Sequence, residues 1–241
     1  MTIRVSVIGA TGRMGKLALE IVQAAQDLEL HSALDSSSEL AQAQGADVIF
    51  EATKLEVSRK VLDFAIQNKI NLLIATSGWS KAALASIEAQ LEDSAVVVIP
   101  NFSVGSVLGS KFASEAAKYF DSVEIVETHH AGKVDSPSGT AIRTAELIGE
   151  SREGSGKATP LIQGVGQDAR GQIVSGVPIH SLRIDGASAR QEVVLAGNHE
   201  VLTISHQANS VQAYSIGILH SIRYTAANKG LTVGLDKVLG I

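Results

Sequence analysis

The chain contains no cysteine among its 241 residues, only four prolines, and few aromatic side chains, which make up 4% of the sequence. Without cysteine, neither a disulfide framework nor a thiolate metal site can form. The basic residues are not clustered and the formal net charge is −5, so we do not expect nucleic acid as a partner. No apolar run is long enough to span a membrane, so no membrane partner is expected either.

The first residues enter a strand-like run at once. Residues 3–8 lack the basic start and the longer apolar stretch of a secretory signal, so we expect a cytoplasmic protein. Hydrophobic residues make up 45% of the chain, enough to build the core of one large domain or two small ones.

Short apolar runs alternate with stretches of helical spacing over the first hundred residues. The predicted strands are 3–8, 28–34, 46–50, 71–75 and 95–99, and the predicted helices are 14–25, 57–66 and one that Ser80 caps. Solid apolar strands are typical of parallel sheets buried on both faces. The pattern therefore predicts a Rossmann-like, doubly wound parallel sheet of the α/β class.

The pattern changes after residue 104. Helices are predicted near 107–119 and 138–148, a long loop over 154–176, and strands at 123–126, 177–184, 191–196 and 201–206. Strands in succession without helices predict a second, mixed α/β domain with a largely antiparallel sheet. A last helix over 213–227 is expected to return to the first domain. The predicted division is 1–104 with 213–241 for dinucleotide binding, and 105–212 for the second domain.

A glycine-rich turn joins the first predicted strand to the first helix. Gly9, Gly12 and Gly15 have the spacing G-x-x-G-x-x-G, and Asp35 ends the second strand. Glycines let the backbone approach a pyrophosphate at a helix N-terminus, and a carboxylate at that strand end binds ribose hydroxyls. A tight turn that only packs helix on strand is the alternative. We predict a dinucleotide site lined by Gly9, Ala10, Thr11, Gly12, Arg13, Met14 and Asp35.

The choice of cofactor depends on two side chains of opposite charge. Asp35 favours NADH because a carboxylate repels a 2′-phosphate, whereas Arg13 is either a solvated side chain or a ligand for that phosphate. We expect NADH to be used and NADPH to be tolerated. The loops after the fourth and fifth strands, 76–78 and 100–103, should border the nicotinamide half because ligands lie beyond the carboxyl ends of such strands, unless they are ordinary turns.

Residues 127–141 concentrate reactive side chains, with two adjacent histidines, a lysine, an aspartate and a Ser-Gly-Thr turn. Imidazole and ammonium groups transfer protons and bind anions, and a capped helix start offers N–H groups to a carboxylate. The segment predicts a site for a small polyanion, and a polar loop with a capped helix is the simpler alternative. A metal site at His129, His130 and Asp135 is not expected, because neighbouring residues on a strand face opposite sides.

The same residues match a family signature, E-x-H-H-x-x-K-x-D-x-P-S-G-T-A, at every specified position of 127–141. The glycine turn, the Asn101-Phe-Ser103 segment and the chain length also match, so essentially the whole chain resembles the dihydrodipicolinate (4-hydroxy-tetrahydrodipicolinate) reductase family. The resemblance implies reduction of a cyclic imine dicarboxylate with NADH or NADPH in the diaminopimelate route of lysine biosynthesis. It also implies a homotetramer assembled through the sheet of the second domain.

The resemblance implies a role for each matching residue. His129 corresponds to a proton donor or acceptor, Lys133 to a proton donor, and His130 to a substrate ligand. Ser138, Gly139 and Thr140 correspond to the turn that holds a substrate carboxylate. The cofactor is expected to lie along the glycine turn and Asp35, and along two further segments: Ala75, Thr76 and Ser77, then Ile99, Pro100, Asn101 and Phe102.

The chain departs from the usual family pattern at three places. Residues 50–54 read Phe-Glu-Ala-Thr-Lys in place of an Asp-Phe-Thr segment followed by Pro, Ala75 replaces a glycine, and Val211 stands where an arginine is common. These changes concern cofactor affinity more than the reaction. A diverged reductase of another cyclic imine or dicarboxylate, or a nucleotide-sensing relative, is therefore the alternative function.

Overall fold

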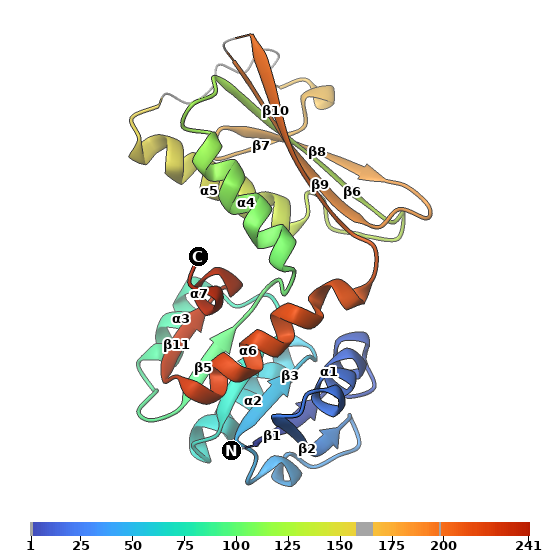
Figure 1. The fold of residues 1–241 in the computed structure, drawn as a ribbon, viewed down its shortest axis with the longest axis vertical. Helices are drawn as coiled ribbons and strands as arrows, with labels where there is room; N and C mark the ends of the chain where they lie inside the picture. Colours follow the sequence, from blue (N-terminus) through green and yellow to red (C-terminus); the bar gives the residue numbers. More distant parts are fainter. Residues whose placement is uncertain (1, 158–165, 198) are drawn as a thin grey trace. The chain divides into compact units, whose positions relative to one another are not determined.

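The computed structural model describes residues 2–157, 166–197 and 199–241. It divides into two compact units, one formed by Met1–Val104 with Val211–Ile241 and the other by Gly105–Ser210 (Figure 1). Among the described residues, no helix has both the length and the apolar character needed to cross a membrane.

The first unit is built on a six-stranded sheet in which all neighbouring strands are parallel. In spatial order the strands are β11 (Gly230–Val233), β5 (Ala95–Val98), β4 (Asn71–Ile74), β3 (Val48–Glu51), β1 (Ile3–Ile8) and β2 (Leu28–Leu34). Its helices are α1 (Arg13–Ala24), α2 (Leu55–Gln67), α3 (Lys81–Glu88), α6 (Ser215–Ala227) and α7 (Leu235–Leu239), with short 3-10 turns at Leu40–Ala43 and Val211–Tyr214.

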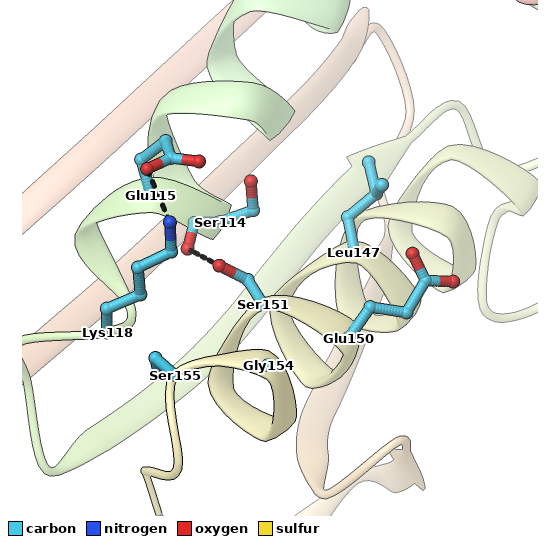
Figure 2. A pocket seen from close by; sticks show the side chains of 8 residues that line it. All are labelled: Ser114, Glu115, Lys118, Leu147, Glu150, Ser151, Gly154 and Ser155. Atoms are coloured by element: carbon cyan, nitrogen blue, oxygen red, sulfur yellow. Dashed lines mark hydrogen bonds and ion pairs between the residues drawn. The ribbon is translucent and has the colours of Figure 1, made fainter.

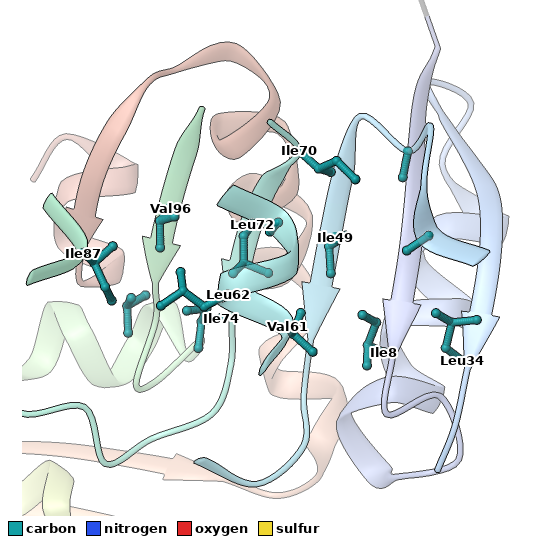
Figure 3. Packing of buried hydrophobic residues seen from close by; sticks show 14 residues of the cluster. Ile8, Leu34, Ile49, Val61, Leu62, Ile70, Leu72, Ile74, Ile87 and Val96 are labelled. Carbon is teal, nitrogen blue, oxygen red and sulfur yellow. The ribbon is translucent and has the colours of Figure 1, made fainter. Parts of the chain in front are cut away.

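The solid apolar strands of this unit are buried on both faces, as the sequence pattern predicts. Every residue of β3 and β5 is buried. One face packs against α2 and α3, where Val61, Leu62 and Ile87 contact strand residues such as Ile49 and Leu72 (Figure 3). The helices α1 and α6 pack on the sheet and on each other. Burying each such aliphatic side chain contributes about 1.5–3 kcal/mol, which holds the sheet as a rigid support.

The strand register aligns the carboxyl ends of the strands. Ile8 pairs with Leu34 on one side and with Glu51 on the other, Glu51 pairs with Ile74, and Ile74 pairs with Val98. The segments that follow these residues therefore leave the sheet at one edge, the edge where ligands bind in such folds. All the segments predicted to bind the cofactor start from this edge.

The sixth strand, β11, is absent from the sequence-based prediction. It consists of the four residues Gly230–Val233, too few to show a period, and it pairs with β5 in parallel. The sequence pattern also does not indicate how closely helix α6 packs against the segment after β5. A Cβ atom on Gly217 would lie 2.0 Å from the carbonyl oxygen of Phe102.

The second unit contains a five-stranded mixed sheet. In spatial order the strands are β10 (Glu200–Ala208), β9 (Ala189–Gly197), β6 (Ser122–His129), β8 (Val177–Arg183) and β7 (Gln172–Val174). Only the β6–β8 pairing is parallel, which confirms the predicted, largely antiparallel sheet. β7 and a 3-10 turn at Asp168–Arg170 lie inside the predicted long loop, of which residues 158–165 are outside the described part.

Two helices cover one face of this sheet: α4 (Val104–Ala116) and α5 (Gly139–Gly154). Ala113 of α4 and Ile148 of α5 share a core cluster with Ile125 of β6 and Leu195 of β9. Along β6, buried residues alternate with partly exposed ones, so the opposite face of the sheet is more open to solvent. The inner face changes from apolar at Ile125 to polar at Glu127 and His129, toward the end of the strand.

Candidate active site

The glycine turn after β1 is shaped by close packing of its own backbone. Gly9 has φ +88°, and a Cβ atom there would lie 2.3 Å from the carbonyl oxygen of Ala52. A Cβ on Gly15 would lie 2.1 Å from the carbonyl oxygen of Gly9. Both positions exclude a side chain, so the turn is compact and the start of α1 lies directly beyond it.

The start of α1 is suited to bind an anion. Gly12 is its N-cap, no described side chain caps it, and its first turn contains no acidic residue. Helix N-terminal N–H groups without a side-chain acceptor attract phosphate, and the helix dipole adds to that attraction. The turn therefore fits the pyrophosphate of a dinucleotide. Arg13 is exposed on the first turn of the helix.

Asp35 follows β2 and is held as a carboxylate. Its Oδ1 accepts hydrogen bonds from the backbone N–H of Ser37 at 2.9 Å, the hydroxyl of Ser37 at 2.7 Å and the hydroxyl of Ser38 at 3.1 Å. These bonds, those from Ser37 foremost, lower the pKa of Asp35 below its ordinary value. The group is thus an ionised acceptor at the strand end where a ribose is expected.

Several side chains after β4 and β5 are turned into the protein. The hydroxyl of Thr76 donates to Glu51 at 2.9 Å and accepts from the N–H of Thr53 at 3.1 Å. Phe102 is buried against Phe50, with ring centroids 6.1 Å apart, and Ile99 is fully buried. These three side chains shape the edge of the sheet, and a ligand there would contact mainly the backbone of their segments.

The neighbouring positions complete this edge. Ser77 and Pro100 are exposed, and Asn101 accepts a hydrogen bond from the backbone N–H of Ser103 at 2.9 Å. Ala75 donates its N–H to the carbonyl of Glu51 at 2.8 Å, which keeps the two adjacent strand ends in register.

The second unit has its own charged cluster at the end of β6, centred on the fully buried Glu127. Arg183, at the end of β8, donates two hydrogen bonds to this carboxylate, at 3.0 Å from Nη1 and 2.9 Å from Nη2. A forked Arg–carboxylate pair of this kind fixes orientation as well as charge. Burial alone raises the pKa of Glu127, but the hydrogen bonds from Arg183 and His129 help to bring it below the ordinary value.

His129 is oriented by the same carboxylate. Its Nδ1 lies 2.5 Å from Glu127 Oε2. Because an ionised carboxylate only accepts hydrogen bonds, Nδ1 carries the proton, and Nε2 of the neutral ring is left as the basic atom. A base whose second nitrogen is held by a buried acid is an arrangement typical of general acid–base catalysis.

Lys133 lies in the loop that follows, and its charge is held in place. Its ammonium group contacts both carboxylate oxygens of Asp135, at 2.7 and 2.8 Å. The hydrogen bonds from Lys133 are the main reason that the pKa of Asp135 lies below its ordinary value. Arg183 also donates to the backbone carbonyl of Asp135 at 2.7 Å, so one guanidinium connects Glu127 to the Lys133 loop.

Ser138 begins α5 and belongs to the same network. Its hydroxyl oxygen accepts from the N–H of Ala141 at 3.2 Å as the helix N-cap, and its own N–H donates to Glu127 at 3.2 Å. Both groups thus have protein partners, and Ser138 is buried. Gly139 is exposed, and no atom lies within 4 Å of the position of a Cβ there, so a ligand could approach this helix start closely.

The residues predicted for proton transfer, His129 and Lys133, lie on the same strand–loop–helix segment as Ser138 and Thr140, which are predicted to bind the substrate. His130, another predicted substrate ligand, is exposed between this strand and its loop. Arg183 was missed by sequence reasoning. Its only signal is its position at the end of a predicted strand, and its role emerges from the register that pairs it with His129.

A second polar site, a groove between α4 and α5, contains none of the predicted catalytic or binding residues (Figure 2). The groove is crossed by the hydroxyl of Ser151, which donates to the carbonyl of Ser114 at 2.8 Å, and is flanked by the Lys118–Glu115 ion pair. Two other lining residues have partners outside the groove: Glu150 pairs with Arg143, and the hydroxyl of Ser155 donates to the carbonyl of Arg152. In the described part of the chain, no three His, Asp or Glu side chains are grouped to hold a metal ion.

Comparison with known proteins supports one assignment. Residues 3–102 match the family described as dihydrodipicolinate reductase, N-terminus, and residues 105–239 match dihydrodipicolinate reductase, C-terminus. The chain belongs to the dihydrodipicolinate reductase family. It is therefore an NAD(P)H-dependent oxidoreductase of this class, and the predicted family, fold class, activity and cofactors are confirmed.

Individual relatives agree over the whole length. The 4-hydroxy-tetrahydrodipicolinate reductase of Clavibacter sepedonicus is 47% identical over 99% of this chain and 87% of that protein. The enzyme of the same name from Streptomyces griseus is 42% identical over 99% of this chain and 98% of that protein. A dipicolinate-bound dihydrodipicolinate reductase from Paenisporosarcina sp. TG-14 is 31% identical, with a TM-score of 0.85 over 98% of this chain and 99% of that chain.

We predict that Arg183→Met destabilises the protein by about 3–5 kcal/mol at neutral pH, because it leaves the buried carboxylate of Glu127 without its cation. Arg183→Lys, the control, keeps the charge but not the fork, so its loss should be smaller. Urea unfolding followed by circular dichroism measures both.

The same experiment has a defined pH dependence. The folded-state pKa of Glu127 is lowered, so its stabilisation is complete above its unfolded pKa, about 4.3, and is lost as the pH falls through the folded value. The difference between wild type and Arg183→Met should therefore shrink in acid. Equal stability of the two proteins at pH 7 would contradict the role given to Arg183.

Proposed function

We propose that residues 1–104 with 213–241 bind the cofactor and that residues 105–212 bind the substrate, 4-hydroxy-tetrahydrodipicolinate, which is reduced to tetrahydrodipicolinate. The 4-hydroxyl group of the substrate leaves as water, and the bound dihydronicotinamide would supply hydride to the resulting conjugated ring. The protein must then hold two substrate carboxylates and provide a proton for the electron-rich carbon that results. The observation that carries this proposal is the Glu127–His129 contact of 2.5 Å beside the charged Lys133 loop.

Lys133 and His129 share the proton transfer in this proposal. Lys133, whose side-chain nitrogen contacts both carboxylate oxygens of Asp135, is the proton donor to the substrate. His129 exchanges protons through Nε2, while Glu127 holds Nδ1 and stabilises the ring when it is charged.

The substrate carboxylates are assigned to the start of α5 and to the neighbouring basic groups. We assign Gly139 and Thr140 as backbone donors at this helix start, and His130 as a further ligand. Ser138 remains a predicted member of this turn. Its cap and its bond to Glu127 support a role in shaping the turn, with its hydroxyl proton as the group it can offer to a ligand.

The cofactor is assigned to the carboxyl edge of the first sheet. Its pyrophosphate lies at Gly9–Met14 in this proposal, its adenosine ribose at Asp35, and its nicotinamide half along Ala75–Ser77 and Ile99–Phe102. The uncapped start of α1 and the ionised state of Asp35 support this assignment.

We also infer a cytoplasmic homotetramer that assembles through the outer face of the second sheet and acts in lysine biosynthesis by the diaminopimelate route. No helix among the described residues packs on that face, which presents Leu182 and Val201 with 44% and 66% of their surfaces exposed. Sedimentation equilibrium tests the assembly, and a monomer at micromolar concentration would exclude it.

The reaction itself is tested with a coupled assay in which dihydrodipicolinate synthase produces the unstable substrate from pyruvate and aspartate semialdehyde. We predict that Lys133→Ala loses about 10²–10⁴-fold in kcat, because it removes the proton donor. Its affinity for NADH, measured by isothermal titration, should not change. A loss of NADH affinity as large as the loss of rate would refute the assigned role.

The assignment of Asp35 is tested by its substitution. Asp35→Ala should weaken NADH binding about 10- to 100-fold, the value of charge-assisted hydrogen bonds to the ribose, and should weaken NADPH binding much less. Arg13→Ala is the matched variant of opposite charge and should affect only NADPH. Equal losses for the two cofactors in Asp35→Ala would exclude the ribose contact.

A further inference from the structure

A second fully buried carboxylate, Glu51, lies at the carboxyl end of β3 in the first unit. Its Oε1 accepts from the backbone N–H of Thr53 at 2.6 Å, from the hydroxyl of the same residue, and from the hydroxyl of Thr76 at 2.9 Å. Its Oε2 accepts from the hydroxyl of Ser58 at 2.5 Å. All of these described partners are neutral, in contrast to the arginine that neutralises Glu127 in the other unit.

These partners come from three different segments. Thr53 lies in the loop after β3, Ser58 in the first turns of α2, and Thr76 in the segment after β4. The hydroxyl of Thr76 also accepts from the N–H of Thr53 at 3.1 Å, so the two loops are joined directly as well as through the carboxylate. We call Glu51, Thr53 and Thr76 the loop latch.

The loop latch adjoins the glycine turn. The backbone after Glu51 is so close to this turn that a Cβ atom on Gly9 would lie 2.3 Å from the carbonyl oxygen of Ala52 and 3.0 Å from the methyl group of Thr53. β3 follows β1 in the sheet, and β2 lies on the other side of β1. The latch therefore lies where the strand order reverses, beneath the crevice that binds dinucleotides in such sheets.

Burying the carboxylate of the latch costs more free energy than a purely structural element needs to. A carboxyl group removed from water must be fully hydrogen-bonded, and an apolar residue would fill the end of a buried strand without that demand. The carboxylate instead fixes the position of two loops. Several donors converge on it, and they hold the loop after β4 in place relative to the loop after β3.

We infer that Glu51 is a positioning residue for the nicotinamide ring of the cofactor, acting through Thr76 and the segment 75–78. This inference rests on the proposed placement of the cofactor along that segment. The adenosine ribose, assigned to Asp35 after β2, lies on the other side of β1 from the latch.

The test compares two ligands that share all but the nicotinamide end. NADH and ADP-ribose are titrated into wild type, Glu51→Ala, Glu51→Gln and Thr76→Val by calorimetry. Glu51→Ala should raise the Kd for NADH about tenfold or more and leave the Kd for ADP-ribose unchanged. Glu51→Gln should recover part of the loss, because the amide oxygen can still accept from Thr53 and Thr76.

Two further variants separate the latch from its surroundings. Ser58→Ala, the control, removes a partner of Glu51 that does not reach the loop after β4, so its Kd for NADH should stay at the wild-type value. Combining Glu51→Ala with Thr76→Val should weaken NADH no further than either change alone, since both break one connection.

Each contrary result has a distinct meaning. Equal losses for NADH and ADP-ribose would show a general structural role and overturn the inference, as would an unchanged Kd for NADH in Glu51→Ala. If Glu51→Ala does not fold, as judged by its circular dichroism, Thr76→Val and Glu51→Gln decide between the same outcomes. A wild type that binds neither ligand would overturn the proposed cofactor site, and the inference with it.

Discussion

The proton-handling site depends on one buried carboxylate, Glu127. Removing this group from water is tolerated because the fork of Arg183, the ring of His129 and the N–H of Ser138 all donate to it. Each donor comes from a different part of the second unit: the end of β8, the end of β6 and the start of α5. A single charge therefore sets the orientation of the imidazole that we propose for proton transfer and the position of the helix start assigned to a substrate carboxylate.

Both units use their sheets in the same way, since residues needed for chemistry lie where buried strands end. In the first unit the register aligns Leu34, Ile8, Glu51, Ile74 and Val98, so the loops that follow share one edge. In the second unit the parallel pairing of β6 with β8 brings His129 beside Arg183. The apolar strands make each sheet rigid. Hydrogen bonds to the buried carboxylates Glu51 and Glu127 then fix the loops that follow the strands.

Much of this structure can be predicted from residue patterns, because many of its elements depend on residues that are close together in the sequence. The bounds of β2, the cap of α5 at Ser138 and the glycine turn were all readable from spacing and residue type. What escaped prediction depends on contacts distant in the chain. The fork between Arg183 and Glu127 joins residues 56 positions apart, and β11 is a four-residue strand whose identity comes from pairing with β5. Glu51 stood out only as a departure from the family pattern, and its partners emerge only from the fold.

In the proposed chemistry, Glu127 holds His129 with Nδ1 protonated and Nε2 available for proton transfer. Nitrogen-15 NMR of the histidine rings, with the His129 signals assigned by comparison with His129→Gln, measures this directly. At a pH where the ring is neutral, we predict that His129 carries its proton on Nδ1 in wild type and loses this preference in Glu127→Gln. A neutral His129 protonated on Nε2 in the wild-type protein would contradict the account.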